Sequence, residues 1–158
     1  MRVSIGVIQA FALAAGAALL TGLSLPVQAG LGGDARSVET DRVQLKATVA
    51  VTAAAGFTVH QLTLPSGTLV HEYLSPAGKI FAVAWKGREI PDLQQALGDY
   101  YTTASAALNS TPRGSDHRHR SVERADIVVH TSAHMRSHSG LVYVPALLPQ
   151  GVSPNDLQ

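Results

Sequence analysis

The sequence predicts an α+β fold: an antiparallel β-sheet of four or five strands packed with one main helix and a short N-terminal helix. Residues 57–86 are rich in Thr, Val, Tyr, Phe and Trp and contain two turns, which predicts a three-stranded β-meander. Apolar residues then recur at helical spacing over about residues 91–107. Short apolar runs at 127–130 and 141–144 predict two further strands. The apolar stripe of the main helix can lie across one face of the meander and bury the apolar side chains of both.

The composition leaves room for one domain and excludes several classes of protein. The chain has 158 residues, of which 46% are hydrophobic and 15% are charged. Twelve basic and eleven acidic residues give a formal charge of +1, so we expect no nucleic-acid partner. The sequence has no cysteine, which excludes disulfides, thiol nucleophiles and cysteine-ligated metals.

Residues 1–29 have the composition of a cleaved signal peptide. Arg2 is followed by no charged residue until Asp34, and the stretch between them is mostly apolar. Val27 and Ala29 are small or medium-sized residues at the third and first positions before a possible cleavage site, so we expect cleavage after Ala29. The protein would then be exported to the periplasm or the medium. A single globular domain over 30–158 would remain, with no stable membrane span. The alternative is an uncleaved anchor, because the apolar stretch is nearly long enough to cross a bilayer.

Capping residues and apolar spacing predict the two helices. Ser37 can accept the hydrogen bond that begins a short helix over about 37–47. Pro91 suits the first position of the main helix, and Asp92 suits its first turn. Gly98 is the weak point of this helix, because glycine costs about 1 kcal/mol relative to alanine within a helix. The apolar stripe comprises Leu93, Leu97, Tyr100, Ala104 and Leu108.

The meander is expected to have three strands, separated by two turns that contain proline and glycine. The turns are Pro65-Ser66-Gly67 and Ser75-Pro76-Ala77-Gly78. The strands are expected at 57–64, 68–74 and 79–86, after a connector at 48–56.

Two-residue loops in these turns would place His60 opposite Tyr73 and Val70 opposite Trp85. Because side chains alternate between the two faces of a strand, this pairing assigns each meander residue to a face. The bulkier face is expected to contact the core and comprises Val59, Gln61, Val70, Glu72, Leu74, Phe81, Val83 and Trp85. The less apolar face comprises His60, Leu62, His71, Tyr73, Ile80, Ala82 and Ala84.

Residues 109–125 are predicted to form an exposed, flexible loop. Val122 and Ala125 are the only apolar side chains in this segment apart from proline, so little burial offsets the entropy of ordering it. Near the end of the chain, Ser153-Pro154-Asn155-Asp156 predicts a last helical turn.

Several short motifs follow one another along the chain after the first thirty residues. They include Leu64-Pro65-Ser66-Gly67-Thr68, Phe81-Ala82-Val83-Ala84-Trp85, Pro91-Asp92-Leu93, His134-Met135-Arg136 and Pro145-Ala146-Leu147-Leu148-Pro149. In this order they resemble the secreted bacterial domain-of-unknown-function family 2844. The resemblance spans nearly all of residues 30–158 and implies a small exported bacterial protein. It implies no activity, cofactor or site, because the family has none assigned.

Motifs for catalysis are weak in this sequence. His71-Glu72 is half of a zinc-protease motif, but position 75, where the second zinc ligand would lie, is serine and the context predicts a strand. The chain also has no nucleophile elbow, no phosphate-binding loop and no dinucleotide-binding glycine motif. We therefore expect no cofactor, and an enzyme is the least favoured class of function.

Five of the seven histidines lie between positions 117 and 138. His130, His134 and His138 are four residues apart, so on a helix neighbours would lie roughly 6 Å apart and two of them could share a metal ion. On a strand, neighbours would be about 13 Å apart. Ile127-Val128-Val129 before them and Ser139-Gly140 after them favour a strand and a turn, so no metal site is predicted.

Two function classes remain. The favoured one is a non-catalytic exported binding or accessory module, whose partner is an envelope protein or a small ligand. Its ligand site is expected on the less apolar meander face, at His60, His71 and Tyr73, where the small side chains of Ala82 and Ala84 leave space. For this face the alternative is that a second layer, such as the N-terminal helix, covers it. The alternative is a periplasmic metal-binding protein that uses the histidines between 117 and 138.

Overall fold

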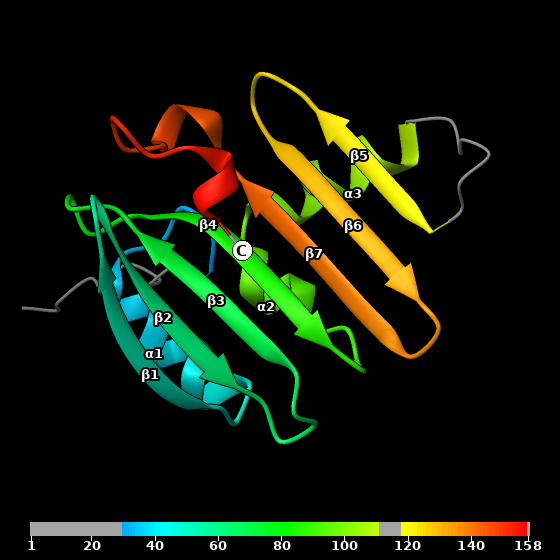
Figure 1. Cartoon of the computed structure of the whole chain (residues 1–158), viewed down its shortest axis with the longest axis horizontal. Coiled ribbons are helices and arrows are strands. Elements are labelled where there is room, and N and C mark those ends of the chain that lie inside the picture. Colours follow the sequence, from blue (N-terminus) through cyan, green and yellow to red (C-terminus); the bar gives the residue numbers. More distant parts are fainter. Residues whose placement is uncertain (1–29, 111–117, 158) are drawn as a thin grey trace, which may run out of the picture.

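The computed structural model describes residues 30–110 and 118–157, and a seven-stranded antiparallel sheet runs through these ranges (Figure 1). The predicted α+β class is confirmed, but the sheet has seven strands rather than four or five. In spatial order the strands are β1 (Thr48–Ala54), β2 (Phe57–Thr63), β3 (Leu69–Leu74), β4 (Ile80–Gly87), β7 (Ser137–Tyr143), β6 (Val128–His134) and β5 (His119–Glu123).

Helices cover one face of the sheet, and the C-terminal segment covers part of the other (Figure 1). The covering helices are α1 (Ala35–Gln44), α2 (Leu93–Leu97) and α3 (Tyr100–Ser110). After β7 the chain forms the short 3₁₀ helices η1 (Pro145–Leu147) and η2 (Pro154–Asp156), and η2 confirms the predicted last turn. We call the two sides of the sheet the helix face and the C-terminal face.

The first helix begins earlier than predicted because Asp34, and not Ser37, is its N-cap. The Asp34 side chain accepts a hydrogen bond from the backbone N–H of Arg36 at 2.8 Å. Ser37 lies inside the helix, where it is fully buried and its hydroxyl donates to the Asp34 carbonyl at 2.6 Å.

The main helix predicted over 91–107 is two helices, α2 and α3. Asp92 caps α2 by accepting hydrogen bonds from the backbone N–H groups of Gln94 and Gln95, at 3.0 and 3.2 Å. Gly98 then has a φ of +50°, which ends α2 because other residues rarely adopt it. The predicted weak point of the helix is therefore the position of the break.

Residues 48–56, expected to be a connector, include the edge strand β1. All seven of its residues are exposed, including Val49 and Val51. A strand without a buried face leaves no alternation of apolar and polar residues in the sequence, which is why the pattern did not predict it. A tight turn that ends at Gly56, with a φ of +86°, leads directly into β2.

The loop predicted at 109–125 is shorter than expected. Helix α3 extends to Ser110, and β5 occupies His119–Glu123; residues 111–117 of this prediction lie outside the described residues. Val122 is 7% exposed, so one apolar side chain is enough to attach this polar segment to the core. Backbone hydrogen bonds to β6 also hold this segment in place.

The first hairpin has a three-residue loop, Pro65-Ser66-Gly67, instead of the two-residue loop expected. The backbone N–H of Leu64 donates to the Thr68 carbonyl at 2.9 Å, and Gly67 takes the left-handed φ of +82° that such loops require. His60 therefore lies opposite Glu72, not opposite Tyr73. The shift of one residue moves every side chain of β2 to the other face: Val59 and Gln61 join the C-terminal face, and His60 and Leu62 join the helix face.

A β-bulge in β4 produces the remaining difference. Tyr73 pairs with Ala82 and Leu74 pairs with Ile80, so Phe81 is an extra residue. Phe81 consequently lies on the C-terminal face with Tyr73, and not on the face of Trp85 as predicted. Ile80 lies on the helix face, and not with Tyr73 as predicted. The predicted pairing of Val70 with Trp85 is correct.

Each face of the sheet carries its own apolar cluster. The helix face holds the larger one, in which Val70, Val83 and Trp85 pack with α2 and α3 residues such as Leu97 and Ala104. The smaller cluster lies on the C-terminal face and comprises Tyr73, Phe81, Ala82, Ala84, Val152 and Leu157.

Candidate binding cleft

A cleft of about 550 Å³ lies on the C-terminal face, bounded by β3, β4, β7, β6, β5 and η2. Two rows of residues cross the strands here, because paired residues of neighbouring strands share a face. The first row runs His71, Ala84, Leu141, His130 and Ser121. The second runs Leu69, Lys86, Ser139, Ser132 and His119. All ten residues line the cleft.

The middle of the cleft is apolar and its ends are polar. Ala84 and Leu141 form the centre of the first row, and Leu157 closes the cleft from the C-terminal segment. His71 lies at one end of this row, and His130 lies towards the other. The side chain of Ala84 is small, which leaves the volume between the two histidines open.

His71 is half-buried at the β3 end of the cleft. Its Nε2 lies 3.2 Å from Oε1 of Gln61, and its ring packs edge-on against Tyr73 with 6.2 Å between the ring centroids. Burial lowers the pKa of His71 from its ordinary value of 6.5, so the imidazole is mostly uncharged at neutral pH.

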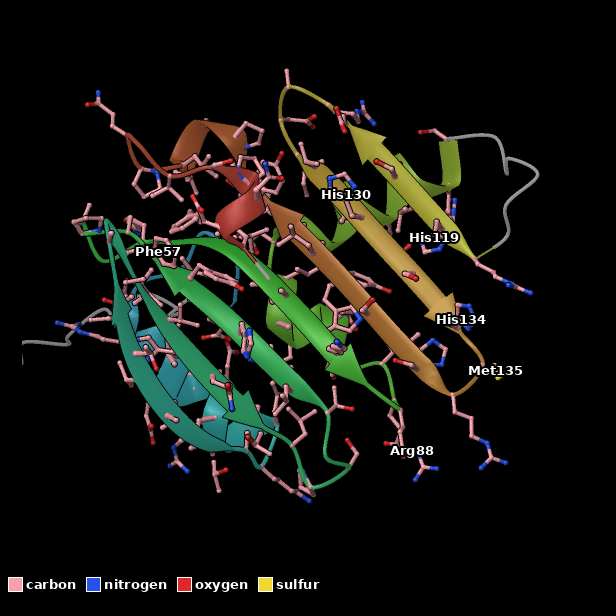
Figure 2. All side chains as sticks on the ribbon, in the orientation of Figure 1. Phe57, Arg88, His119, His130, His134 and Met135 are labelled. Carbon is pink, nitrogen blue, oxygen red and sulfur yellow. The ribbon has the colours of Figure 1, made fainter. Side chains whose placement is uncertain are left out.

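His130 and His119 lie at the opposite end of the cleft, on neighbouring strands (Figure 2). Nδ1 of His130 lies 2.9 Å from the hydroxyl oxygen of Ser121, its partner across β5 and β6. His119 occupies the diagonal position, opposite Ser132. The alternation of histidine and serine in both strands directs all four side chains to one face.

No acidic residue is among the described residues that line the cleft. Lys86 shares the face of Ser139 and supplies a positive charge. Arg120 also borders the cleft, but its guanidinium donates a hydrogen bond to the Leu108 carbonyl of α3 and so points to the helix face. A bound group would therefore meet hydrogen-bond donors and one lysine, with no carboxylate to repel an anion.

The three ligand-site residues expected from the sequence are not all together. His71 lines the cleft, and Tyr73 lies beside it on the same strand and face. Tyr73 is 1% exposed within an aromatic cluster with Phe57 and Phe81, and burial raises its pKa to about 12. His60 lies on the helix face because of the shifted register, so it does not line the cleft.

The sequence reasoning missed Lys86, Ser121, His119 and His130 as residues of one site. The spacing of His119 and Ser121, two residues apart, matches that of His130 and Ser132 and is a strand signal. That signal could have assigned each pair to one face of a strand. Only the pairing of β5 with β6 shows that the two pairs meet.

The arrangement of three histidines on one helix does not occur. His130 and His134 lie along β6 (Figure 2), at a separation of about 13 Å. His138 lies on β7, and because Ser137 is the residue paired with His134, alternation places the His138 side chain on the opposite face. Within residues 30–110 and 118–157, no group of three or more potential metal ligands is close enough to hold a metal ion. The metal-binding alternative is therefore not supported.

A second polar cluster lies under α1 on the helix face. Asp41 and Glu72 are both fully buried. Burial, and then the neighbouring charge of Asp41, raise the pKa of Glu72 to about 9. Burial also raises the pKa of Asp41, against hydrogen bonds that lower it. A hydrogen bond between the two carboxyl groups also contributes to both shifts, and no other hydrogen-bond partner reaches the oxygens of Glu72 within the described residues.

These features define a class of protein: a small α+β domain with one antiparallel sheet and an open cleft on the face away from its helices. A family described as "Protein of unknown function (DUF2844)" matches residues 27–157. The chain belongs to this family, and the resemblance seen in the sequence is confirmed. No curated protein and no solved structure matches the chain. Among the described residues, no helix is long and apolar enough to cross a membrane.

Proposed function

We propose that this chain is an exported, non-catalytic binding protein and that the cleft on its C-terminal face holds a small ligand. The observation that carries the proposal is the pair of cross-strand rows, which place His71, His130, Lys86 and Ser139 around the apolar centre at Ala84 and Leu141. Small-molecule sites have this composition, with a few placed polar groups on an apolar surface, and volumes of about 300–1,000 Å³.

The chemistry of the lining favours a molecule with an apolar body and an acidic group. Lys86 offers a charge to a carboxylate or a similar anion, and Ser139 beside it offers a hydroxyl donor. The uncharged imidazole of His71 can hydrogen-bond at the far end without adding charge. An envelope protein would be recognised in the same way, through one acidic side chain with an apolar stem.

The anionic dye 8-anilinonaphthalene-1-sulfonate tests this proposal, because it has an apolar body and one acidic group. We expect its fluorescence to rise on binding to the exported protein and to fall again when decanoate competes. Lys86→Met should weaken binding by about tenfold, the lower end of what one charged hydrogen bond contributes. Lys79→Met is the matched control, because Lys79 is exposed and does not line the cleft.

A second variant fills the cleft without changing its charge. Ser132→Phe places a ring in the second row, so it should reduce dye binding while circular dichroism stays unchanged. His60→Ala is expected to leave binding unchanged, because His60 lies on the helix face. Equal affinities for the Lys86, Ser132 and Lys79 variants would disprove the cleft as the binding site.

A further inference from the structure

Gly30, which follows the expected cleavage site directly, lies in the folded core and not on the surface. Its backbone nitrogen donates a hydrogen bond to Oδ2 of Asp41 at 2.8 Å. The next residues are also held, since the N–H of Leu31 donates to the Ala96 carbonyl at 3.1 Å and that of Gly32 donates to the Ile80 carbonyl at 2.8 Å. The start of the expected processed chain is therefore a packed element.

Only glycine fits at this position. Gly30 has a φ of +82°, and a Cβ built on it would lie 2.5 Å from the carbonyl oxygen of Ala96. The backbone of Gly30 thus touches α2 directly, with no space for a side chain. This close approach is what brings the Gly30 nitrogen to the buried carboxyl group of Asp41.

The two buried acids at this contact, Asp41 and Glu72, have no lysine or arginine paired with them in the described part of the chain. Oδ1 of Asp41 accepts a hydrogen bond from Nε2 of Gln95 at 2.5 Å, and its Oδ2 accepts the one from Gly30. Glu72 is buried beside it, and apart from the contact between the two carboxyl groups no donor reaches either of its oxygens within the described residues. Across the sheet Glu72 faces His60 on β2 and Val83 on β4.

We propose that cleavage between Ala29 and Gly30 turns the Gly30 amide into an ammonium group that binds Asp41 and Glu72 as a buried salt bridge. The inference rests on the export proposed above. In the cleavage, the export peptidase adds water across the peptide bond: the Ala29 carbonyl carbon takes the hydroxyl group, and the Gly30 nitrogen takes the hydrogen. The resulting amine binds one more proton at neutral pH.

The ammonium group supplies what the amide cannot. An amide nitrogen has one hydrogen, which is already given to Asp41. An ammonium group has three, so it can keep this bond and also donate to the oxygens of Glu72, which receive no hydrogen bond from any other N–H group in the described part of the chain. It also brings a positive charge to two buried acids, which relieves the cost of keeping them in a low dielectric. Because Gly30 is buried once the chain is folded, cleavage has to precede folding.

The test uses protein exported with its own leader. Mass spectrometry should show Gly30 as the first residue. The folded protein is then treated briefly at pH 7 with acetic anhydride, and acetylation is quantified on the N-terminal peptide. We expect the Gly30 amine to react at least tenfold more slowly in the folded protein than in urea, because a buried, paired ammonium is not nucleophilic. The exposed amine of Lys79 is the internal reference.

Two variants give matched comparisons. Asp41→Asn should remove most of the protection of the Gly30 amine, whereas Glu39→Gln should not, because Glu39 is an exposed residue of the same helix. The wild-type protein alone already decides the question if Asp41→Asn fails to fold. Equal acetylation of the Gly30 amine in the folded and unfolded wild-type protein would overturn the inference.

The outcomes also separate this inference from the proposed function. A membrane-bound protein that still begins with Met1 would overturn the export and this inference together. A mature protein that begins at a residue other than Gly30 would overturn only this inference. Dye binding in the cleft is measured independently, on the opposite face of the sheet.

Discussion

Gly140 lies directly against the indole ring of Trp85, its pairing partner on β4. A Cβ at position 140 would lie 2.2 Å from Cζ2 of this ring, a distance that no side chain can accommodate. Trp85 is 5% exposed and belongs to the larger apolar cluster. Because Gly140 on β7 has no side chain, there is space above it for the indole ring of Trp85, the largest side chain of β4.

This relationship predicts that either residue is difficult to replace. Trp85→Ala should lower the free energy of unfolding by about 3–5 kcal/mol, because it leaves a large cavity between the sheet and the helices. Gly140→Ala should also destabilise, since the added methyl group displaces the indole ring. Urea unfolding measures both changes. His71→Ala should cost much less, and an equal loss for it would contradict the assignment of Trp85 to the main core.

The same substitution is expected to destabilise one edge strand of the sheet and to leave the other nearly unchanged. Val122→Ala on β5 removes a side chain that is 7% exposed, and should cost about 1–3 kcal/mol. Val51→Ala on β1 removes one that is 59% exposed, and should change stability by no more than about 0.5 kcal/mol. Thermal unfolding of both variants provides the comparison. A loss at Val51 as large as that at Val122 would show that another surface covers β1.

The raised pKa of Glu72 predicts that stability depends on pH in any form of the protein in which the Gly30 nitrogen is still an amide and not an ammonium group. Between the ordinary pKa of 4.5 and the folded value of about 9, the folded protein holds a proton that the unfolded protein releases. The free energy of unfolding should therefore fall as the pH rises from about 5 to 9. Inserting an alanine between Ala29 and Gly30 gives an exported protein in which cleavage before the inserted alanine leaves the Gly30 nitrogen as an amide. Adding Glu72→Gln to this protein should flatten the dependence of its unfolding free energy on pH.

In the normally processed protein, the Gly30 ammonium should reduce this fall, because a nearby positive charge lowers the pKa of Glu72. Urea unfolding at several pH values compares the two proteins. If the stability of the protein with the inserted alanine instead rose towards pH 9, Glu72 would not be a buried carboxyl group that lacks a nearby cation.

Burial predicts unusual titration of His60 and His71. For both, burial lowers the pKa from 6.5, so the unfolded chain binds protons that the folded protein does not. Their contribution to stability is fully present above pH 6.5 and is lost as the pH falls from this value through the lower pKa of the folded protein. Proton NMR of the two imidazoles should give midpoints below 6.5. Midpoints at 6.5 for both would mean that each ring is solvated.

The sequence pattern predicted correctly those features that depend on residues close together in the chain. The strands around Val70 and Val83, the turn at Ser153 and the weak point at Gly98 all depend on residues close in sequence. The α+β class follows from them, and so does the assignment of Val70, Val83 and Trp85 to the main core face. The order of motifs was enough to recognise the family.

Only the tertiary structure decided which side chains meet. A third residue in the loop at Pro65-Ser66-Gly67 moved His60 away from Tyr73, and the bulge at Phe81 changed the face of that ring. Strand β1 has no buried face, so no pattern marks it.

The candidate sites depend on segments that are distant in sequence. His71 and His130 line two ends of one cleft, and Gly30 donates a hydrogen bond to Asp41 in the core. Side-chain alternation is a property of one strand. Register is a property of two strands and the loop that joins them, and a shift of one residue reverses every face.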